Sequence, residues 1–359
     1  GDLPGIIPTS GWGYSFGQNQ ATRPLGYGPH WEGAVVEIPW QVYRYTGDIT
    51  FLREFYPVMR KYISHLNSVS ENHLLTFGID DHKSIKTHTE GAYISSAYFH
   101  DLTMKLADMA RILGKESDSG ELTSLAERIF QTFQERYYNS TDASYGNGGQ
   151  TALALALDCG LVPDSLYSDV LDKLLDKIEE SGYHFDAGVV GVKKVINVLL
   201  ENARTDVLYK MSIRTDFPSF GNWIEMGANT MWQNWDGSQS RNHIMFGSIG
   251  DYFYKGLAGI NPVKTDPGFK VIALKPQFPD DMEYLKAGHK TSSGWIRTEW
   301  KRQGKNILYS LEIPEDTETQ LQLTGYMPAD DLPDFRQIDS GYLVNLKPGK
   351  YEITLRKMK

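Results

Sequence analysis

From Ala34 to about residue 258, apolar residues recur with the period of about 3.6 residues that marks one face of an α-helix. Asp48 precedes the first stripe as a candidate N-cap, and Gly114 ends the second. Two further segments, 151–157 and 189–200, are nearly all apolar, which indicates helices buried on most sides. The stripes consist of Ile49, Leu52, Phe55, Tyr56, Met59 and Ile63; Tyr98, Leu102, Leu106, Met109 and Leu113; Leu122, Leu125, Ile129, Phe133 and Tyr137; and Leu166, Val170, Leu171, Leu174, Leu175 and Ile178.

After Pro262 the pattern changes to a two-residue alternation rich in Val, Ile, Leu, Tyr and Thr. This change predicts two domains, a helical one over residues 1–262 and a β-sandwich over residues 263–359. Trp295 and Trp300 are candidate sugar contacts, although packing in the sheet or an interface is the favoured interpretation. The predicted strands are 269–276, 283–290, 294–302, 306–313, 319–324 and 342–356.

The links between the predicted helices are long and carry glycine, aromatic and acidic residues. Functional side chains gathered in such links favour a toroid of helical hairpins, which brings its loops to one end. Residues 1–30 are expected to form an ordered loop, because aromatic side chains there need burial. Those side chains are Trp12, Tyr14, Phe16 and Tyr27, and the links are 78–82, 145–150, 183–188 and 217–223.

Charge and composition narrow the functional classes. The net charge of −9 argues against nucleic acid or an anionic membrane as a partner. No apolar run is long enough to span a bilayer, and no signal peptide precedes the first helix. The opening Gly1-Asp2-Leu3-Pro4 has no initiator Met, so we expect a longer parent protein with a missing N-terminal part, located in the periplasm or secreted.

Metal, cofactor and nucleophilic chemistry find little support. Cys159 is the single cysteine, lies between Leu157 and Leu161, and is expected to be a buried, inert thiol. The histidines form no ligand-spaced pairs, so no metal site is expected. No Gly-x-Ser-x-Gly elbow and no strand-linked phosphate loop occurs, which disfavours a serine hydrolase and predicts no cofactor.

The segment 227–243 is the strongest functional signal. It concentrates aromatic, amide, carboxylate and imidazole groups with almost no aliphatic residues, and three of the eight tryptophans lie between Trp223 and Trp235. Flat rings and polar side chains together suit a sugar site; the alternative is a polar loop that happens to carry tryptophan. His243 is expected to bind substrate or handle a proton, with a structural histidine as the alternative.

Glycoside hydrolysis needs two carboxyl groups beside the bond that breaks. The candidate acids, each next to glycine or an aromatic residue, are Glu32, Asp80, Asp81, Asp186, Glu225 and Asp236. For any single one, an N-cap or a turn is the alternative, and Asp236-Gly237 is itself a turn signal. Trp31, Asp81, Glu225, Trp232, Gln233, Asp236 and His243 are predicted to converge on one concave surface, and the expected substrate-binding set also includes Glu32, Asp80, His82, Asp186, Trp223 and Trp235.

Nearly the whole chain resembles the catalytic region of bacterial α-L-rhamnosidases, glycoside hydrolase family 78. The matching blocks are residues 31–48, the Gly78-Ile79-Asp80-Asp81-His82 loop with His82 in place of the family's Trp, 150–152, 184–191, and 218–260. The resemblance implies an (α/α)6 barrel followed by a β-sandwich, and inverting hydrolysis of terminal α-L-rhamnose.

The sequence departs from the family pattern at both catalytic positions. The family's general acid lies in an Asp-Glu-Arg-like loop before the Trp31 block, and no such loop occurs here, so the acid and about two helices of the barrel are expected to be missing. Gln233 stands where the resemblance implies the catalytic base, and an amide cannot take a proton from water. Gln233 is then expected to orient water or bind a hydroxyl, with Glu225 or Asp236 as alternative sources of charge.

Three functions stay open at this point. The first is a glycoside hydrolase acting on rhamnose or a related sugar in an oligo- or polysaccharide. The second is a sugar-binding homologue that has lost the chemistry. The third is another (α/α)6 enzyme, such as an unsaturated uronyl hydrolase or a polysaccharide lyase. A lyase acting on an anionic polymer should carry basic loops, and the loops here are acidic and aromatic, which ranks it third.

Overall fold

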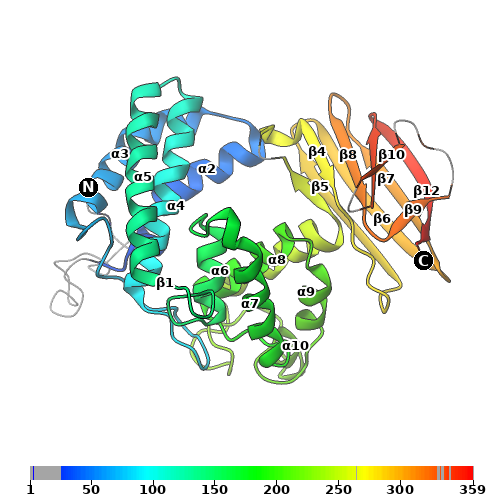
Figure 1. Ribbon diagram of the computed structural model, residues 1–359. Helices are drawn as coiled ribbons and strands as arrows, with labels where there is room; N and C mark the ends of the chain where they lie inside the picture. Colours follow the sequence, from blue (N-terminus) through cyan, green and yellow to red (C-terminus); the bar gives the residue numbers. More distant parts are fainter. Residues whose placement is uncertain are drawn as a thin grey trace. The chain divides into compact units, whose positions relative to one another are not determined.

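The computed structural model of the protein describes residues 3, 26–263, 265–329, 332, 335–338 and 341–358. The chain divides into two compact units (Figure 1). The first comprises Gly1–Trp40, Thr50–Asn202 and Lys210–Ser248, and the second Gln41–Ile49, Ala203–Tyr209 and Ile249–Lys359. Each unit is treated by itself below. Trp12, Tyr14 and Phe16, predicted to be buried, lie outside the described residues.

The first unit is helical, as the periodicity predicts. Figure 1 shows α4 and α5 as two long helices side by side. Further along the chain, the short buried α6 packs against both α7 and α8. The helices are α1 (Pro29–Glu32), α2 (Ala34–Thr46), α3 (Thr50–Val69), α4 (Gly91–Ile112), α5 (Glu116–Tyr137), α6 (Gln150–Asp158), α7 (Tyr167–Glu180), α8 (Val189–Glu201), α9 (Thr205–Ser212) and α10 (Phe220–Glu225), of which α2 and α9 run across the boundary between the units. Short turns η1 (Asp164–Leu166) and η2 (Ile244–Phe246) and a small hairpin of β1 (Tyr138–Asn139) and β2 (Ser144–Tyr145) complete it.

Most predicted stripe residues form the core. On α3 the structure differs from the prediction in two respects, the exposure of one stripe residue and the first residue of the helix. Leu52, Met59 and Ile63 are fully buried, but Phe55 is 36% exposed. Phe55 lies at the edge of the stripe and stacks on Phe51, one turn earlier, with 6.1 Å between ring centroids. The helix begins at Thr50, one residue beyond the start that an Asp48 cap predicts. The signal at Gly114 is confirmed, because α4 ends at Ile112 and Gly114 has a φ of +72°.

The second unit contains a sandwich-like pair of five-stranded sheets, in the orders β10-β11-β8-β4-β3 and β5-β6-β7-β12-β9. Neighbours are antiparallel except β4 and β8. The predicted run 342–356 is two strands, because Lys347 and Pro348 separate β11 from β12. The strands are β3 (Ile260–Pro262), β4 (Val271–Leu274), β5 (Tyr284–Thr291), β6 (Gly294–Gln303), β7 (Asn306–Ile313), β8 (Glu318–Leu323), β9 (Tyr326–Pro328), β10 (Phe335–Ile338), β11 (Gly341–Leu346) and β12 (Gly349–Lys357). Helix α11 (Ile249–Asp251), the π-helix η3 (Tyr252–Leu257) and the short 3-10 helix η4 (Pro267–Phe269) precede or interrupt them.

Strict alternation along the strands builds the core of this unit. In β6, Ile296, Thr298 and Trp300 are buried while their neighbours are exposed. Trp300 is fully buried among the other core side chains, which confirms the packing interpretation for this tryptophan, whereas Trp295 is 41% exposed. The short segment 41–49 belongs with this unit, and the Tyr45 ring contacts Phe269 at 5.8 Å.

Candidate functional site

The loops that precede successive helices of the first unit are joined to one another by backbone hydrogen bonds. Ile79 N–H donates to the carbonyl of Tyr27 at 3.0 Å, and Val189 N–H donates to that of His82 at 2.8 Å. The indole N–H of Trp235 donates to the carbonyl of Ala187 at 3.2 Å. Loops separated by some fifty to a hundred residues in the sequence therefore form one connected region (Figure 1), as the hairpin arrangement predicts.

Asp81 is the most heavily bonded of the predicted acids. It is 2% exposed, and its carboxylate accepts four hydrogen bonds, from Thr151 Oγ1 at 2.6 Å and from the N–H groups of Gly188, Val190 and Gly191 at 2.7, 3.0 and 3.3 Å. Burial raises the pKa of Asp81 above its ordinary value, while these hydrogen bonds act in the opposite direction. The carboxylate caps the N-terminus of α8, so its observed role is to fix a loop to a helix.

Two glycines allow this close approach. A Cβ on Gly191 would lie 2.0 Å from Thr151 Oγ1, and one on Gly188 would lie 2.3 Å from the carbonyl oxygen of His82. A side chain at position 191 would therefore displace Thr151, and one at position 188 would displace the backbone of the loop that carries Asp81. The Ala187-Gly188-Val189-Val190-Gly191 block thus has a steric reason for its glycines.

Three other predicted acids also bind backbone N–H groups. Asp186 accepts from Lys86 N at 2.8 Å and from Thr87 N and Oγ1 at 3.2 and 2.6 Å. Asp80 accepts from Gly91 N at 2.8 Å, at the first residue of α4. Glu32 is buried and accepts from Tyr27 N at 2.9 Å. The alternative interpretation of these acids as caps and turn residues therefore describes their observed contacts, and a substrate-binding role for them stays a prediction.

The tryptophans of the 217–246 region are packed into an aromatic cluster. Trp223, Trp232 and Trp235 are each no more than 3% exposed. Trp223 Nε1 donates to the carbonyl of Trp235 at 2.8 Å, and the rings of Phe185 and Trp235 stack at 6.1 Å. Their faces are covered by protein, so stacking on a sugar would require the cluster to open. Trp31, by contrast, is partly exposed, with its ring 6.3 Å from that of Tyr27.

Residues 230–243 form a loop whose two limbs pair with each other. His243 N–H donates to the carbonyl of Met231 at 2.8 Å, and Gln233 N–H donates to that of Ser240 at 2.9 Å. The side chain of Gln233 is engaged in the same pairing, because its Oε1 accepts from Ser240 N at 3.4 Å. Arg241 lies over the Trp232 ring, 4.8 Å from its centroid, and this cation–π contact holds the loop against the aromatic cluster.

The remaining candidates lie on or near this loop. Asp236 is exposed and accepts from Ser238 N at 3.0 Å; hydrogen bonding to Ser238 lowers its pKa, and the nearby Lys83 ammonium lowers it further. His243 has a buried Nδ1 without a hydrogen-bond partner in the described structure. Glu225 is exposed at the end of α10.

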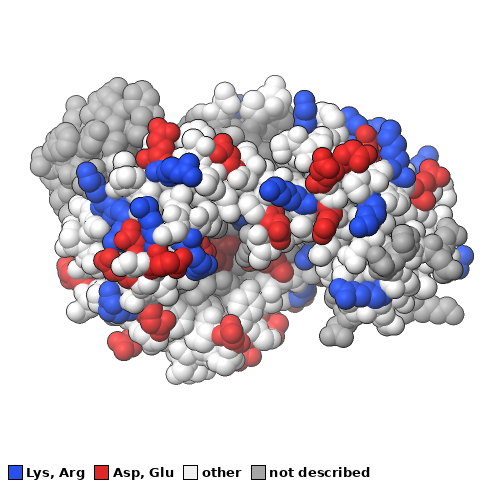
Figure 2. Space-filling model, turned by 90° about the horizontal axis from the view of Figure 1, so that it is seen from above, with Lys and Arg blue, Asp and Glu red and all other residues white. Residues whose placement is uncertain are grey.

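These contacts bring together several of the predicted residues but not all. Asp81, Asp186, Trp235 and Asp236 lie on loops that are bonded or electrostatically coupled to one another. His82 lies on the same set of loops, because its carbonyl accepts from Val189. In the described part of the chain, no hydrogen bond, ion pair or ring contact joins Trp31, Glu225 or His243 to these four residues, so the common concave surface stays a prediction for them. On the face shown in Figure 2, acidic and basic side chains are interspersed.

Comparison with known proteins places these residues in a family. Residues 1–257 match the model of the bacterial α-L-rhamnosidase six-hairpin glycosidase domain, and residues 259–330 match that of the bacterial α-L-rhamnosidase C-terminal domain. The chain belongs to the bacterial α-L-rhamnosidase family. This assignment confirms the fold inferred from the resemblance, the C-terminal portion of a six-hairpin helical domain followed by a β-sandwich.

Relatives and solved structures agree with the family. An α-L-rhamnosidase of Streptomyces avermitilis is 30% identical over 331 residues, which are 89% of this chain and 31% of that protein; one of Formosa agariphila is 25% identical over 82% of this chain and 34% of its own length. The chain thus spans about a third of the curated relatives it matches. The crystal structure of the Streptomyces enzyme complexed with L-rhamnose matches with a TM-score of 0.84 at 27% identity, covering 90% of this chain and 33% of that one. The structure of the enzyme from Dictyoglumus thermophilum matches with a TM-score of 0.85 at 27% identity, covering 92% and 40%.

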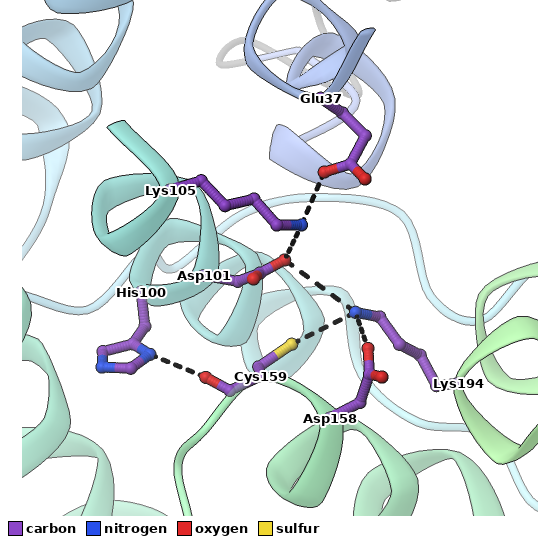
Figure 3. A network of polar contacts seen from close by, with 7 residues as sticks. All are labelled: Glu37, His100, Asp101, Lys105, Asp158, Cys159 and Lys194. Carbon is purple, nitrogen blue, oxygen red and sulfur yellow. Dashed lines mark hydrogen bonds and ion pairs between the residues drawn. The ribbon is translucent and has the colours of Figure 1, made fainter. Parts of the chain in front are cut away.

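Inside this α-L-rhamnosidase domain lies a charged network that sequence reasoning missed (Figure 3). Acidic and basic groups alternate along it: Glu37, Lys105, Asp101, Lys194 and Asp158. Lys105 Nζ lies 2.6 Å from Glu37 Oε2 and 2.9 Å from Asp101 Oδ2; Lys194 Nζ lies 3.9 Å from Asp101 Oδ2 and pairs with Asp158. The network therefore connects α2, α4, α6 and α8.

Lys194 is the most deeply placed member. The exposed side-chain fraction is 5% at Lys194 and 25% at Glu37, so the network runs from the interior toward solvent. Burial acts to lower the pKa of Lys194, but Asp158 and its neighbours outweigh it and hold that pKa well above its ordinary value. A lysine within the nearly all-apolar segment 189–200 was the available sequence signal, since such a charge needs partners when buried.

Cys159 completes the network and behaves as predicted. The thiol is buried, Lys194 Nζ lies 3.4 Å from its Sγ, and the Cys159 carbonyl oxygen lies at hydrogen-bond distance, 2.9 Å, from His100 Nδ1. Burial raises the pKa of the Cys159 thiol to about 12, against the opposing effect of Lys194. The burial confirms the prediction of a buried cysteine, and the raised pKa disfavours the reactive thiolate at neutral pH.

Metal binding and membrane insertion find no structural counterpart in the part of the chain that the structure describes. No group of three His, Cys, Asp or Glu side chains there is arranged to hold a metal ion. None of the described helices is long and apolar enough to cross a membrane.

Proposed function

We propose that this chain forms the C-terminal part of a glycoside hydrolase that removes terminal α-L-rhamnose, or a related sugar, from oligo- or polysaccharides with inversion. Membership of the α-L-rhamnosidase family supports this, as does the likeness to the Streptomyces enzyme complexed with L-rhamnose. The supporting observation within the chain is the Trp235–Ala187 hydrogen bond, which anchors the loop carrying Gln233, Asp236 and His243 onto the loops of Asp81 and Asp186.

Inverting hydrolysis uses a general acid and a general base whose carboxyl groups are about 6.5–9.5 Å apart. The resemblance implies an acid in an Asp-Glu-Arg-like loop, and we place that loop outside these residues. It implies the base at Gln233, whose side-chain oxygen already accepts from Ser240. The remaining amide NH2 can donate to water or a sugar hydroxyl but cannot accept a proton from them, so Gln233 binds rather than catalyses.

Asp236 and Glu225, the two alternative sources of charge, are poorly suited to act as the general base. Asp236 has a pKa lowered by Ser238, and a weaker proton acceptor makes a weaker general base. Glu225 is exposed on α10 rather than enclosed beside the loop. The glutamine at position 233 is the observation that supports a second candidate function, a sugar-binding homologue in which catalysis is impaired.

Binding of L-rhamnose tests both versions of the proposal. His243 has a buried nitrogen without a partner, the kind of group that a ligand hydroxyl or water satisfies. In calorimetry with L-rhamnose, we expect the His243→Ala variant to lose about 1–3 kcal/mol of binding free energy relative to the unchanged chain. His65→Ala, on the partly exposed side of α3, serves as the matched control and should bind normally. Absence of any L-rhamnose binding, or an equal loss in both variants, would overturn the proposal.

A further inference from the structure

A pocket lies in the helical unit, close in sequence to the 183–188 loop. Its volume is about 490 Å³, and it is lined by Tyr183, Lys210, Ile213, Arg214, Thr215 and Asp216. Two segments build it: the turn after α7 that leads into the 183–188 loop, and the end of α9 with the residues that follow.

The pocket shares its loops with the candidate site. His184 Nε2 lies 3.1 Å from Asp216 Oδ1, which joins the two segments at the pocket wall. One residue further along, Phe185 contacts Phe220 at 5.9 Å and stacks on Trp235. The pocket and the candidate loops are therefore built on the same segment of the chain, residues 183–188.

The charged side chains of the pocket differ in whether they have a partner of opposite charge. Arg214 donates two hydrogen bonds to Asp216, at 2.8 and 2.6 Å, and this pairing holds the Asp216 pKa at about 2. The two charges thus cancel throughout the physiological pH range. Lys210 contacts only Tyr183, at 4.7 Å from the ring centroid and 3.4 Å from the hydroxyl; within the described parts of the chain, no carboxylate lies at ion-pair distance from its Nζ.

The pocket also offers an apolar and an aromatic surface. Ile213 is 52% exposed, which is high for an aliphatic side chain at a pocket wall. Tyr183 is held in the left-handed region with a φ of +62°, its N–H donates to the carbonyl of Ile178 at 2.9 Å, and its hydroxyl lies 3.4 Å from Glu179 Oε1. These contacts fix the tyrosine ring beneath the Lys210 ammonium.

We propose that this pocket is a subsite for a hexuronic acid residue of the substrate. The sugar carboxylate pairs with the Lys210 ammonium, and the C–H face of the sugar ring lies against Ile213. In this pocket the Lys210 ammonium has no carboxylate partner among the described residues, so it favours an acidic sugar over a neutral one. The assignment of this sugar to the substrate rests on the proposed function, since the pocket would then hold the residue next to the terminal rhamnose.

The test compares two sugars that differ only at C6, D-galacturonate and D-galactose, with L-rhamnose titrated separately, all by NMR on the full chain. We expect galacturonate to bind at least about tenfold more tightly than galactose, the scale of one hydrogen bond to a charged group, and to weaken as salt is raised. Lys210→Gln should remove the preference. Lys193→Gln makes the same charge change on the exposed side of α8 and should keep it.

The outcomes separate the two proposals. Equal binding of galacturonate and galactose, or the same result for Lys210→Gln and Lys193→Gln, overturns the uronate subsite whatever rhamnose does. Loss of L-rhamnose binding with a preserved galacturonate preference overturns the proposed function and leaves an acidic-sugar site. Circular dichroism of both variants verifies their folding, which the exposure of both lysines favours.

Discussion

The carboxylate of Asp81 accepts a 2.7 Å hydrogen bond from the backbone N–H of Gly188, 107 residues further along the chain. This contact places a carboxylate at the positive end of the α8 dipole and binds the loop of one hairpin to the start of a later helix. The buried Asp81 side chain therefore helps to hold the 78–82 loop against the start of α8.

Replacing Asp81 should destabilise the helical unit. In Asp81→Asn one acceptor oxygen becomes an NH2 group, which faces a backbone N–H that it cannot satisfy. We expect a loss of about 1–3 kcal/mol in the free energy of unfolding, measured with urea and far-ultraviolet circular dichroism. Asp172→Asn, on the exposed side of α7, is the matched control and should change it by less than about 0.5 kcal/mol. Equal stabilities of the two variants would contradict the role of Asp81.

Breaking the charged network should lower the free energy of unfolding by more than Asp81→Asn does. Lys194→Met leaves Asp158 without its buried cation, while Asp101 keeps its ion pair with Lys105; removing one partner of a buried ion pair typically costs about 3–5 kcal/mol. The neighbouring Lys193→Met changes an exposed lysine and should have little effect. In the double variant Lys194→Met/Asp158→Leu the loss should be smaller than in Lys194→Met alone, because one uncompensated charge is removed. A larger loss in the double variant would show that packing, not charge, dominates.

His30 should make the fold sensitive to acid. Burial lowers its pKa from 6.5 to about 3, against a smaller opposing contribution from the Ile79 backbone. Below pH 6.5 the unfolded chain binds a proton that the folded chain does not, so this group disfavours folding increasingly as the pH falls from 6.5 toward 3, and contributes nothing above 6.5. The NMR signals of the His30 ring should not titrate between pH 7 and about 4. A midpoint near the ordinary value would show that the ring is open to solvent.

The sequence predicts the helices and strands well because their information is local. Stripes such as Leu52, Met59 and Ile63 mark a buried face wherever the helix lies. The sequence singles out the Gly78–His82 loop and gives an N-cap or a turn as the alternative for Asp81, but it does not reveal the partners of Asp81, which are at 151 and 188–191. Spacing along the chain gives no measure of such distances.

The tryptophan-rich segment shows a different limit. Loop residues have no periodicity, so the sequence does not show whether the rings of Trp223, Trp232 and Trp235 point inward. The structure buries all three, with Phe185 and Phe220 supplied by other segments. Lys194 was missed for a related reason, since its carboxylate partners come from α4 and α6.

The central claim is that Gln233 occupies the position of the catalytic base, and turnover by the Gln233→Glu variant tests it most directly. The measurement is hydrolysis of an aryl α-L-rhamnoside by a protein that carries this chain together with the upstream Asp-Glu-Arg-like loop. With the glutamine in place, turnover should be very slow or absent. Gln233→Glu should raise the rate by about 10²–10⁴-fold, the contribution of a positioned general base. Gln239→Glu adds the same charge at an exposed position of the same loop and should leave the rate low. Rapid turnover with Gln233 unchanged, or an equal gain from both variants, would contradict the account.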